Sequence, residues 1–252
     1  MKNFFIFIFV ILFYSTVTAS YILIPMDSDS QEEHLKAYGL TYWTLQKKLK
    51  VKWLLNYRGG SFLLPDTDEI KKECQVRGVS FVLLSNSKTE EILNLISSPS
   101  QNMEAVILEK APRIAVYSPK GNQPWDDAVT MVLTYAEIPY TIIYDEEVLG
   151  DQLVLFDWLH LHHEDFTGQY GKFYRAYRSA PWYIQNKKDA ELMASNLGYD
   201  KVSDLKLDVS LKIRNYVVGG GFMFAMCSAT DSFDIALSAE GVDICETMFD
   251  DD

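Results

Sequence analysis

The sequence contains little cysteine and histidine and no cluster of basic residues, and each shortage excludes a class of function. Three cysteines among 252 residues, without a Cys-x-x-C pair, argue against thioredoxin-like redox chemistry and structural zinc. The formal net charge is −12 and no Lys/Arg cluster offsets it, which excludes nucleic acid as a partner. No Walker-type loop or internal repeat is present, and we expect no cofactor.

Residues 1–20 have the features of a secretory signal peptide. Lys2 precedes the apolar run from Phe4 to Tyr14, and the small residues Val17 and Ala19 then place cleavage before Ser20. This run is shorter than the ~20 residues that span a bilayer, and no cysteine follows the cleavage site to carry a lipid. We therefore expect an exported protein, periplasmic or secreted, without a stable membrane anchor.

An odd number of cysteines has a consequence in an oxidising compartment. Cys74, Cys227 and Cys245 can form at most one disulfide, so at least one thiol stays free. A buried structural cysteine and a catalytic nucleophile are both compatible with this count.

The remaining residues divide into two blocks. Residues 21–108 are predicted to form a smaller N-terminal α/β unit, in which strands and helices alternate and favour a mainly parallel sheet. The polar stretch from Ser97 to Met103, which contains Pro99, is the predicted linker. Residues 109–252 repeat the alternation, with strands expected at Arg113 to Tyr117, Tyr140 to Tyr144 and Leu153 to Leu161.

The most informative stretch leads to Cys227. Three glycines, Gly219 to Gly221, precede an apolar run that ends at Met226, and an apolar helix-like segment follows the cysteine. A strand that stops abruptly and presents a nucleophile at the start of a helix is a nucleophile elbow, and it tolerates only small neighbours. Ala225 and Ala229 occupy those neighbouring positions.

The elbow assigns roles to the surrounding residues. Cys227 is the candidate nucleophile, and the backbone N–H of Ser228 at the helix N-terminus is the candidate oxyanion donor. Gly220 and Gly221 are further candidate oxyanion or substrate-binding positions. The same stretch is also typical of a buried core strand that follows a glycine-capped helix, so both interpretations stay open.

Three of the four histidines fall within Trp158 to Phe166. If residues 156–162 form a strand, His160 and His162 lie on one face, and His-x-His with Glu164 is a metal-ligand spacing. His162 or His163, at the end of this strand, is alternatively a general base, with Glu164 and Asp165 as substrate-binding carboxylates. A third interpretation is that the imidazoles only complete local hydrogen bonds.

Aromatic residues are concentrated between Phe166 and Tyr183, with Gln169, Arg175 and Arg178 among them. They are typical of a cleft for a small molecule, a peptide or a glycan. Helix packing against a sheet explains the same pattern.

Three segments carry a resemblance to known proteins. Arg113 to Pro119, Trp158 to Gly168 and Gly219 to Thr230 resemble an exported bacterial family commonly labelled asparagine synthetase B, over essentially all of residues 21–252. The glycine-rich strand with its cysteine also resembles class I glutamine amidotransferase-like domains, which implies a flavodoxin-like fold with Cys227 as nucleophile. Such domains have further strands beyond the elbow, so we expect the domain to continue past Asp252.

The resemblance implies cysteine chemistry rather than asparagine synthesis. The Ser-Gly-Gly-x-Asp-Ser loop that binds ATP in such synthetases is not found, and no cysteine begins the mature chain. No histidine follows Cys227, so His162 or His163 would have to serve as the proton acceptor. The hypotheses are therefore an exported Cys-dependent amidase or hydrolase, a non-catalytic binding or scaffold protein, and a His-based metal hydrolase.

Overall fold

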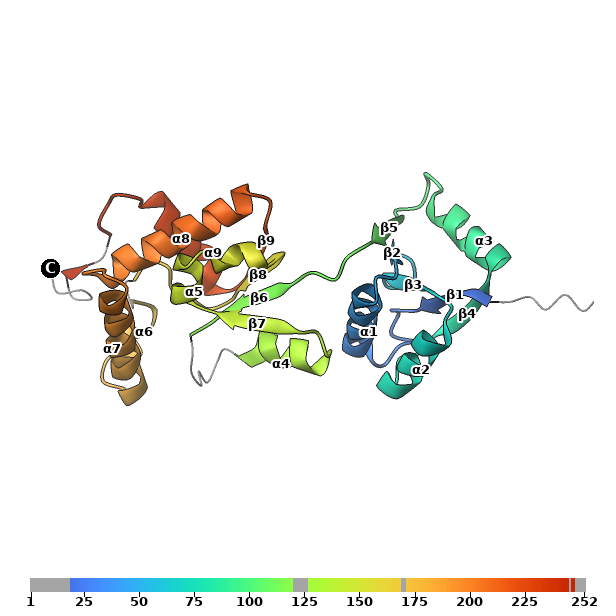
Figure 1. Cartoon of the computed structure of the whole chain (residues 1–252), viewed down its shortest axis with the longest axis horizontal. Helices are drawn as coiled ribbons and strands as arrows, with labels where there is room; N and C mark the ends of the chain where they lie inside the picture. The colour runs from blue at the N-terminus through green and yellow to red at the C-terminus, as the bar shows by residue number, and fades with distance from the viewer. Residues whose placement is uncertain (1–18, 120–126, 169–170, 245, 248–252) are drawn as a thin grey trace, which may run out of the picture. The chain divides into compact units, whose positions relative to one another are not determined.

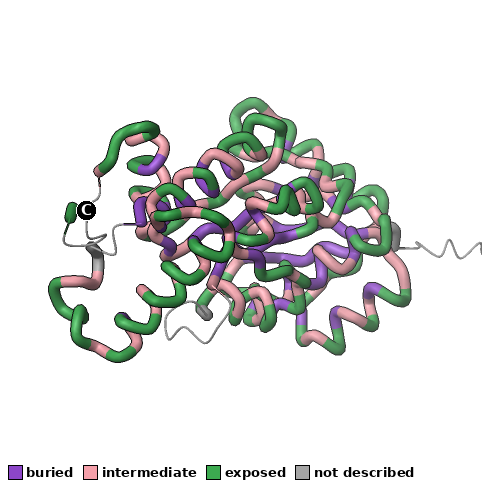
Figure 2. Tube along the Cα trace, turned by 60° about the vertical axis from the view of Figure 1, so that its left-hand side comes forward, coloured by how far each residue is buried: buried purple, intermediate pink, exposed green. Residues whose placement is uncertain are grey.

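The computed structural model describes residues 19–119, 127–168, 171–244 and 246–247. The chain divides into two compact units, the first ending at Lys110 and the second beginning at Ala111. Figure 1 shows each unit as a sheet with its own helices. In both units buried residues concentrate on the strands and on the inner sides of the helices (Figure 2).

The first unit is an antiparallel sheet with three helices among its described residues. Its elements are, in chain order, β1 (Ala19–Ile24), α1 (His34–Gln46), β2 (Val51–Leu55), β3 (Ser61–Pro65), α2 (Asp68–Arg77), β4 (Val82–Ser85), α3 (Asn86–Ile96) and β5 (Glu104–Leu108). The strand order is β4-β1-β3-β2-β5, and every pair is antiparallel.

The predicted parallel sheet is therefore wrong for this unit. Only a tight turn, which includes Tyr57 and Gly60, joins β2 to β3, and parallel neighbours need a crossover of a dozen or more residues. Gly59 lies in this turn at φ +77°, where an added Cβ would sit 2.4 Å from the carbonyl oxygen of Met26. The turn thus packs directly on the chain that leaves β1.

The predicted linker from Ser97 to Met103 is also wrong. It is a loop inside the first unit, because β5 follows it and pairs with β2 from Val51↔Leu108 to Leu55↔Glu104. The boundary between the units lies beyond β5, at Lys110 and Ala111.

The second unit contains a parallel sheet. Its elements are β6 (Ile114–Tyr117), α4 (Asp127–Tyr135), β7 (Tyr140–Ile143), α5 (Asp145–Leu149), the 3₁₀ helix η1 (Gln152–Leu155), β8 (Trp158–Leu161), α6 (Gly171–Tyr177), α7 (Pro181–Asn196), α8 (Val202–Val218), β9 (Phe222–Ala225) and α9 (Ser228–Ser238). The strand order is β7-β6-β8-β9, with all three pairs parallel, so the α/β class and the parallel sheet predicted here are confirmed.

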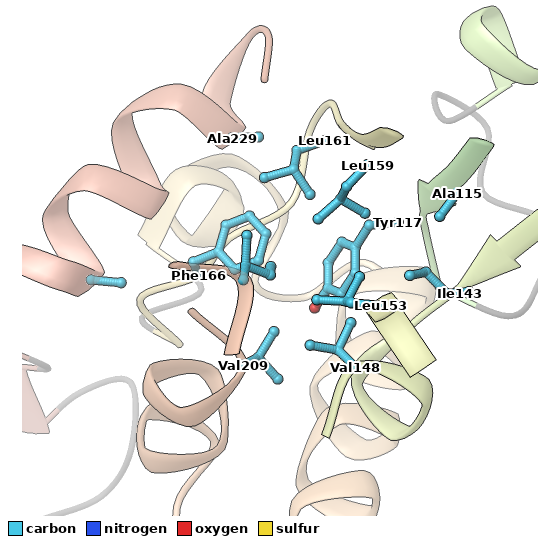
Figure 3. Close-up of a cluster of buried hydrophobic side chains, with 12 residues drawn as sticks. Ala115, Tyr117, Ile143, Val148, Leu153, Leu159, Leu161, Phe166, Val209 and Ala229 are labelled. Atoms are coloured by element: carbon cyan, nitrogen blue, oxygen red, sulfur yellow. The ribbon is translucent and has the colours of Figure 1, made fainter. Parts of the chain in front are cut away.

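One face of this sheet forms the core of the unit. Leu159 and Leu161 of β8 pack with Tyr117 of β6, Val209 of α8 and Phe166, and all are at most 1% exposed (Figure 3). Because successive side chains of a strand point to opposite faces, Trp158 and His160 belong to the other face of β8. The remaining core side chains come from β6, β7, η1 and the helices α5, α8 and α9.

The predicted signal peptide lies almost entirely outside the described residues, which begin with Ala19 at the start of β1. Within the described residues, every helix is too short or too polar to cross a bilayer.

Candidate functional site

The carboxyl ends of the four parallel strands meet at one edge of the second sheet, called the carboxyl edge below. Tyr117 ends β6, Asp145 begins the helix after β7, His162 follows β8, and Cys227 closely follows β9. In open α/β sheets ligands bind outside this edge. The sequence and the fold thus bring the predicted cysteine and histidines to the same edge.

Cys227 has a strained backbone. It stands between the end of β9 and the first residue of α9, with φ 54° and ψ −139°, and its side chain is exposed. Positive φ is rare for residues other than glycine and accumulates at functional sites. Ala229 behind it is fully buried, so no larger side chain fits there. The backbone follows the strand–turn–helix course that the sequence predicts.

Hydrogen bonds join the loop after β8 (residues 162–165, the histidine loop) to the turn that holds Cys227 (residues 226–228, the cysteine turn). Four of them run from the turn and α9 to carbonyl oxygens of the β8 end and the histidine loop: Met226 N to Leu161 O at 3.1 Å, Ala229 N to His162 O at 3.2 Å, Ser228 Oγ to His163 O at 2.9 Å, and Ser232 Oγ to Glu164 O at 2.7 Å. The histidine loop and the cysteine turn therefore form one continuous structure.

The imidazole rings of His160, His162 and His163 are neighbours in space. The ring centroids of His162 and His163 are 3.6 Å apart, and those of His160 and His162 are 6.2 Å apart. His160 is only 5% exposed and stacks on Phe224 of β9. Burial, with a smaller contribution from His162, lowers the pKa of His160 to about 4, so this imidazole is neutral at physiological pH.

The thiol of Cys227 is exposed, and the two residues that follow it donate hydrogen bonds to the carbonyl oxygens of His162 and His163. The backbones of His162 and His163 therefore lie beside the cysteine turn. Catalytic hydrogen bonds often form only when substrate is bound, so this arrangement does not decide between the two histidines.

The carboxylates of Glu164 and Asp165 shape the loop. Glu164 is nearly buried and accepts a hydrogen bond of 2.8 Å from the backbone N–H of His162. Asp165 accepts bonds from the backbone N–H and the hydroxyl of Thr167. In the structure both residues hold the loop in place next to the cysteine turn.

The role predicted for Gly220 and Gly221 at the cysteine is wrong. Both precede β9, whereas Cys227 follows it, so the whole strand separates them. At about 3.3 Å per residue they lie well over 10 Å from the thiol, too far to bind an oxyanion there. Sequence proximity suggested a shared site, but a strand carries its two ends to opposite edges of the sheet.

The metal site considered for His160, His162 and Glu164 finds no support in the structure. Among the described residues, no three His, Cys, Asp or Glu side chains are arranged to hold a metal ion. The Glu164 carboxylate is directed to the His162 backbone, and His160 is stacked on Phe224.

The aromatic residues of α6 and α7 pack on one another. Ring centroids of Phe173, Tyr177 and Trp182 lie 5.2 to 6.1 Å apart, and Tyr183 beside them is buried. Packing of α6 on the start of α7 thus explains this aromatic cluster. Gln169 and Tyr170 lie outside the described residues.

A buried ionic cluster next to the carboxyl edge was missed by sequence analysis. Lys206 of α8 donates to Asp145 at 2.8 and 2.9 Å, to Tyr117 at 3.0 Å and to Tyr144 at 3.2 Å. Lys206 and Asp145 are 5% and 2% exposed. The only sequence signal was a lysine within the apolar stripe of a helix.

The charges in this cluster compensate one another. Burial by itself lowers the pKa of Lys206, but Asp145 and Tyr144 outweigh it, and the net pKa is raised. Burial and the Asp145 charge raise the pKa of Tyr117, whose hydroxyl donates to Asp145. Tyr117 also stacks on Phe166, which follows the histidine loop, so the buried ionic cluster packs against the chain next to that loop.

We expect Cys227→Gly to be more stable than Cys227→Ala by about 1 kcal/mol, because glycine adopts positive φ without strain. Urea unfolding of the second unit measures the difference. The matched pair Ser232→Gly and Ser232→Ala in helix α9 should show the opposite order, since glycine weakens a helix. Equal stability of the two Cys227 variants would show that the turn is unstrained.

No family model matches the chain, and neither a curated protein nor a solved structure is significantly similar to it.

Proposed function

We propose that the second unit is a flavodoxin-like domain of the class I glutamine amidotransferase type, and that Cys227 is the nucleophile of an exported amidase or hydrolase. The observation that carries the proposal is the positive φ of Cys227 at a strand-to-helix turn on the carboxyl edge. The strand order gives further support. Numbered within the unit, the strands run second, first, third, fourth, which is the flavodoxin-like order without its last strand.

The chemistry follows from the position of each group. The Cys227 thiolate attacks the carbonyl carbon of an amide, and the developing oxyanion is stabilised by the Ser228 N–H at the start of α9. His162 or His163 accepts the thiol proton and passes it to the amine as the C–N bond breaks. Water then cleaves the thioester, releasing the acid and restoring the thiol.

Export is part of the same proposal, and it is supported by residues 1–20 alone. Cleavage before Ser20 leaves residues 20–24 of β1 in place, so the first sheet keeps this strand between β4 and β3. The resemblance to the exported family labelled asparagine synthetase B agrees with this location.

Iodoacetamide labelling of the folded protein tests the nucleophile. We expect Cys227 to react at neutral pH about tenfold or more faster than free glutathione, because catalytic cysteines are activated by their surroundings. Cys74 should stay unlabelled until the protein unfolds, since it is fully buried and burial raises the pKa of its thiol to about 12. Mass spectrometry of each cysteine peptide between pH 5 and 9 provides the measurement.

Two variants locate the base. If His162→Asn slows the labelling of Cys227 and His163→Asn does not, His162 is the proton acceptor, and the reverse result assigns His163. A Cys227 that labels no faster than glutathione would overturn the nucleophile.

A second candidate function is a non-catalytic binding or scaffold protein. The observation that favours it is the set of hydrogen bonds from the cysteine turn and α9 to carbonyl oxygens of the loop after β8, which is what a turn with a packing role requires. In that case the turn serves packing alone, and ordinary labelling kinetics at Cys227 would be the result.

A further inference from the structure

The triple-glycine turn, Gly219 to Gly221, has no place in the chemistry at Cys227, and it borders a separate cavity. This cavity of about 580 Å³ lies at the amino edge of the second sheet, the edge opposite Cys227. Its walls come from α5 and η1, from the C-terminal part of α8 and from the residues that precede β6, β8 and β9. The volume is that of a typical small-molecule site.

The glycines form one wall of this cavity. Gly220 has φ +99°, and an added Cβ there would meet no atom within 4 Å, so the space beside it is empty. An added Cβ on Gly221 would lie 2.2 Å from the Tyr216 ring. Since glycine is present, the Tyr216 ring rests directly on the turn, and Tyr216 itself lines the cavity. The sequence motif thus has a structural reason that is independent of Cys227.

The cavity contains charged groups of both signs. Arg113 pairs with Asp157 at 3.1 Å, and Lys212 pairs with Asp151. The Nε and Nη2 atoms of Arg113 donate to Asp157, so its Nη1 keeps N–H groups for a ligand. Asp151 is largely exposed and its second carboxylate oxygen can accept further bonds.

Apolar side chains of Val148, Leu153 and Phe156 also line the cavity. The positive charges of Arg113 and Lys212 and the negative charges of Asp151 and Asp157 sum to zero. A ligand with one charge of each sign can bond a cation and a carboxylate of this wall at the same time, whereas a ligand with a single charge can use only one of them.

We propose that this cavity binds a free α-amino acid with an apolar side chain. The ligand carboxylate bonds Nη1 of Arg113, since guanidinium groups match carboxylates in geometry. Its ammonium group bonds Asp151, and its side chain lies on Leu153 and Phe156. The site is separate from the carboxyl edge, so it does not depend on the function proposed for Cys227.

Isothermal titration calorimetry of the full chain with L-leucine tests the site. We expect saturable binding of L-leucine, and binding about tenfold or more weaker for N-acetyl-L-leucine, which lacks the ammonium, and for L-leucinamide, which lacks the carboxylate. Asp151→Asn should weaken L-leucine binding by a similar factor without affecting the fold, because Asp151 is exposed.

A matched pair of variants locates the binding. Asn215→Trp places a large ring at the exposed cavity wall and should abolish binding, whereas Val217→Trp on the same helix end, outside the cavity lining, should not. No saturable binding of L-leucine, binding unchanged by Asn215→Trp, or equal binding of all three compounds would overturn the proposal.

Discussion

Replacement of Lys206 by methionine is expected to lower the free energy of unfolding of the second unit by about 3–5 kcal/mol. The ammonium group is buried and bonds both oxygens of Asp145, together with the hydroxyls of Tyr117 and Tyr144. Its loss leaves the Asp145 carboxylate buried without a counter-charge. An uncompensated charge of this kind costs far more than the pair itself contributes.

The measurement is the urea dependence of hydrogen exchange, with peptides from residues 19–110 as an internal reference for the first unit. The double variant Lys206→Met with Asp145→Asn removes both charges, so it should be more stable than Lys206→Met alone. Lys187→Met is the control, since the Lys187–Glu191 pair is partly exposed and should contribute at most about 1 kcal/mol. A loss at Lys206 no larger than at Lys187 would mean that the cluster is hydrated.

The second large effect is a loss of stability in acid through His160. Burial lowers the pKa of His160 to about 4, whereas an unfolded chain restores it to about 6.5. The unfolded state then binds more protons between these values, so stability is full above pH 6.5 and falls as the pH drops toward 4. The difference in pKa corresponds to a loss of about 3 kcal/mol.

His160→Leu removes the titrating ring and should flatten this part of the stability–pH curve. Unfolding of the second unit is measured between pH 4 and 7.5 for the natural protein and the variant, and the two curves are subtracted. Other groups cancel in this difference. His163→Asn, in the loop beyond the strand, is the control and should leave most of the slope. Parallel curves for the natural protein and His160→Leu would contradict the buried, neutral imidazole.

The course of the chain around Cys227 could be predicted because it depends on local residue properties. Glycines before the strand, an uninterrupted apolar run and the small residues Ala225 and Ala229 permit few other backbones. Only the edge of the sheet at which the glycines lie is predicted wrongly. Gly220 and Gly221 are near Cys227 in sequence, but β9 places them at the amino edge.

The direction of the strands in the first unit could not be read from the same pattern. Alternating strands and helices fit parallel and antiparallel sheets alike, and the decision rests on which strands pair. Here β1 lies between β3 and β4, which follow it much later in sequence, and β5 extends the edge beside β2. These pairings are long-range contacts, which local periodicity does not encode.

The buried cluster was hidden for a related reason. Lys206 is a single lysine within the apolar stripe of α8, and its partner Asp145 looks like an ordinary first residue of a helix. Their pairing appears only when α8 crosses the sheet beside α5. A single charged residue inside an apolar stripe is a weak signal, and it becomes informative when a counter-charge can be assigned.

The order in which the second unit assembles follows from the connection between β8 and β9. The hydrogen bonds between the histidine loop and α9 join residues 65 and 68 positions apart in sequence. Closing so long a loop costs chain entropy, which is recovered only when α8 and β9 have docked. The turn at Cys227 is therefore expected to form late in folding and to separate from the histidine loop early in unfolding. Exchange of the Ala229 amide hydrogen, which bonds the carbonyl oxygen of His162, ahead of global unfolding would report this opening directly.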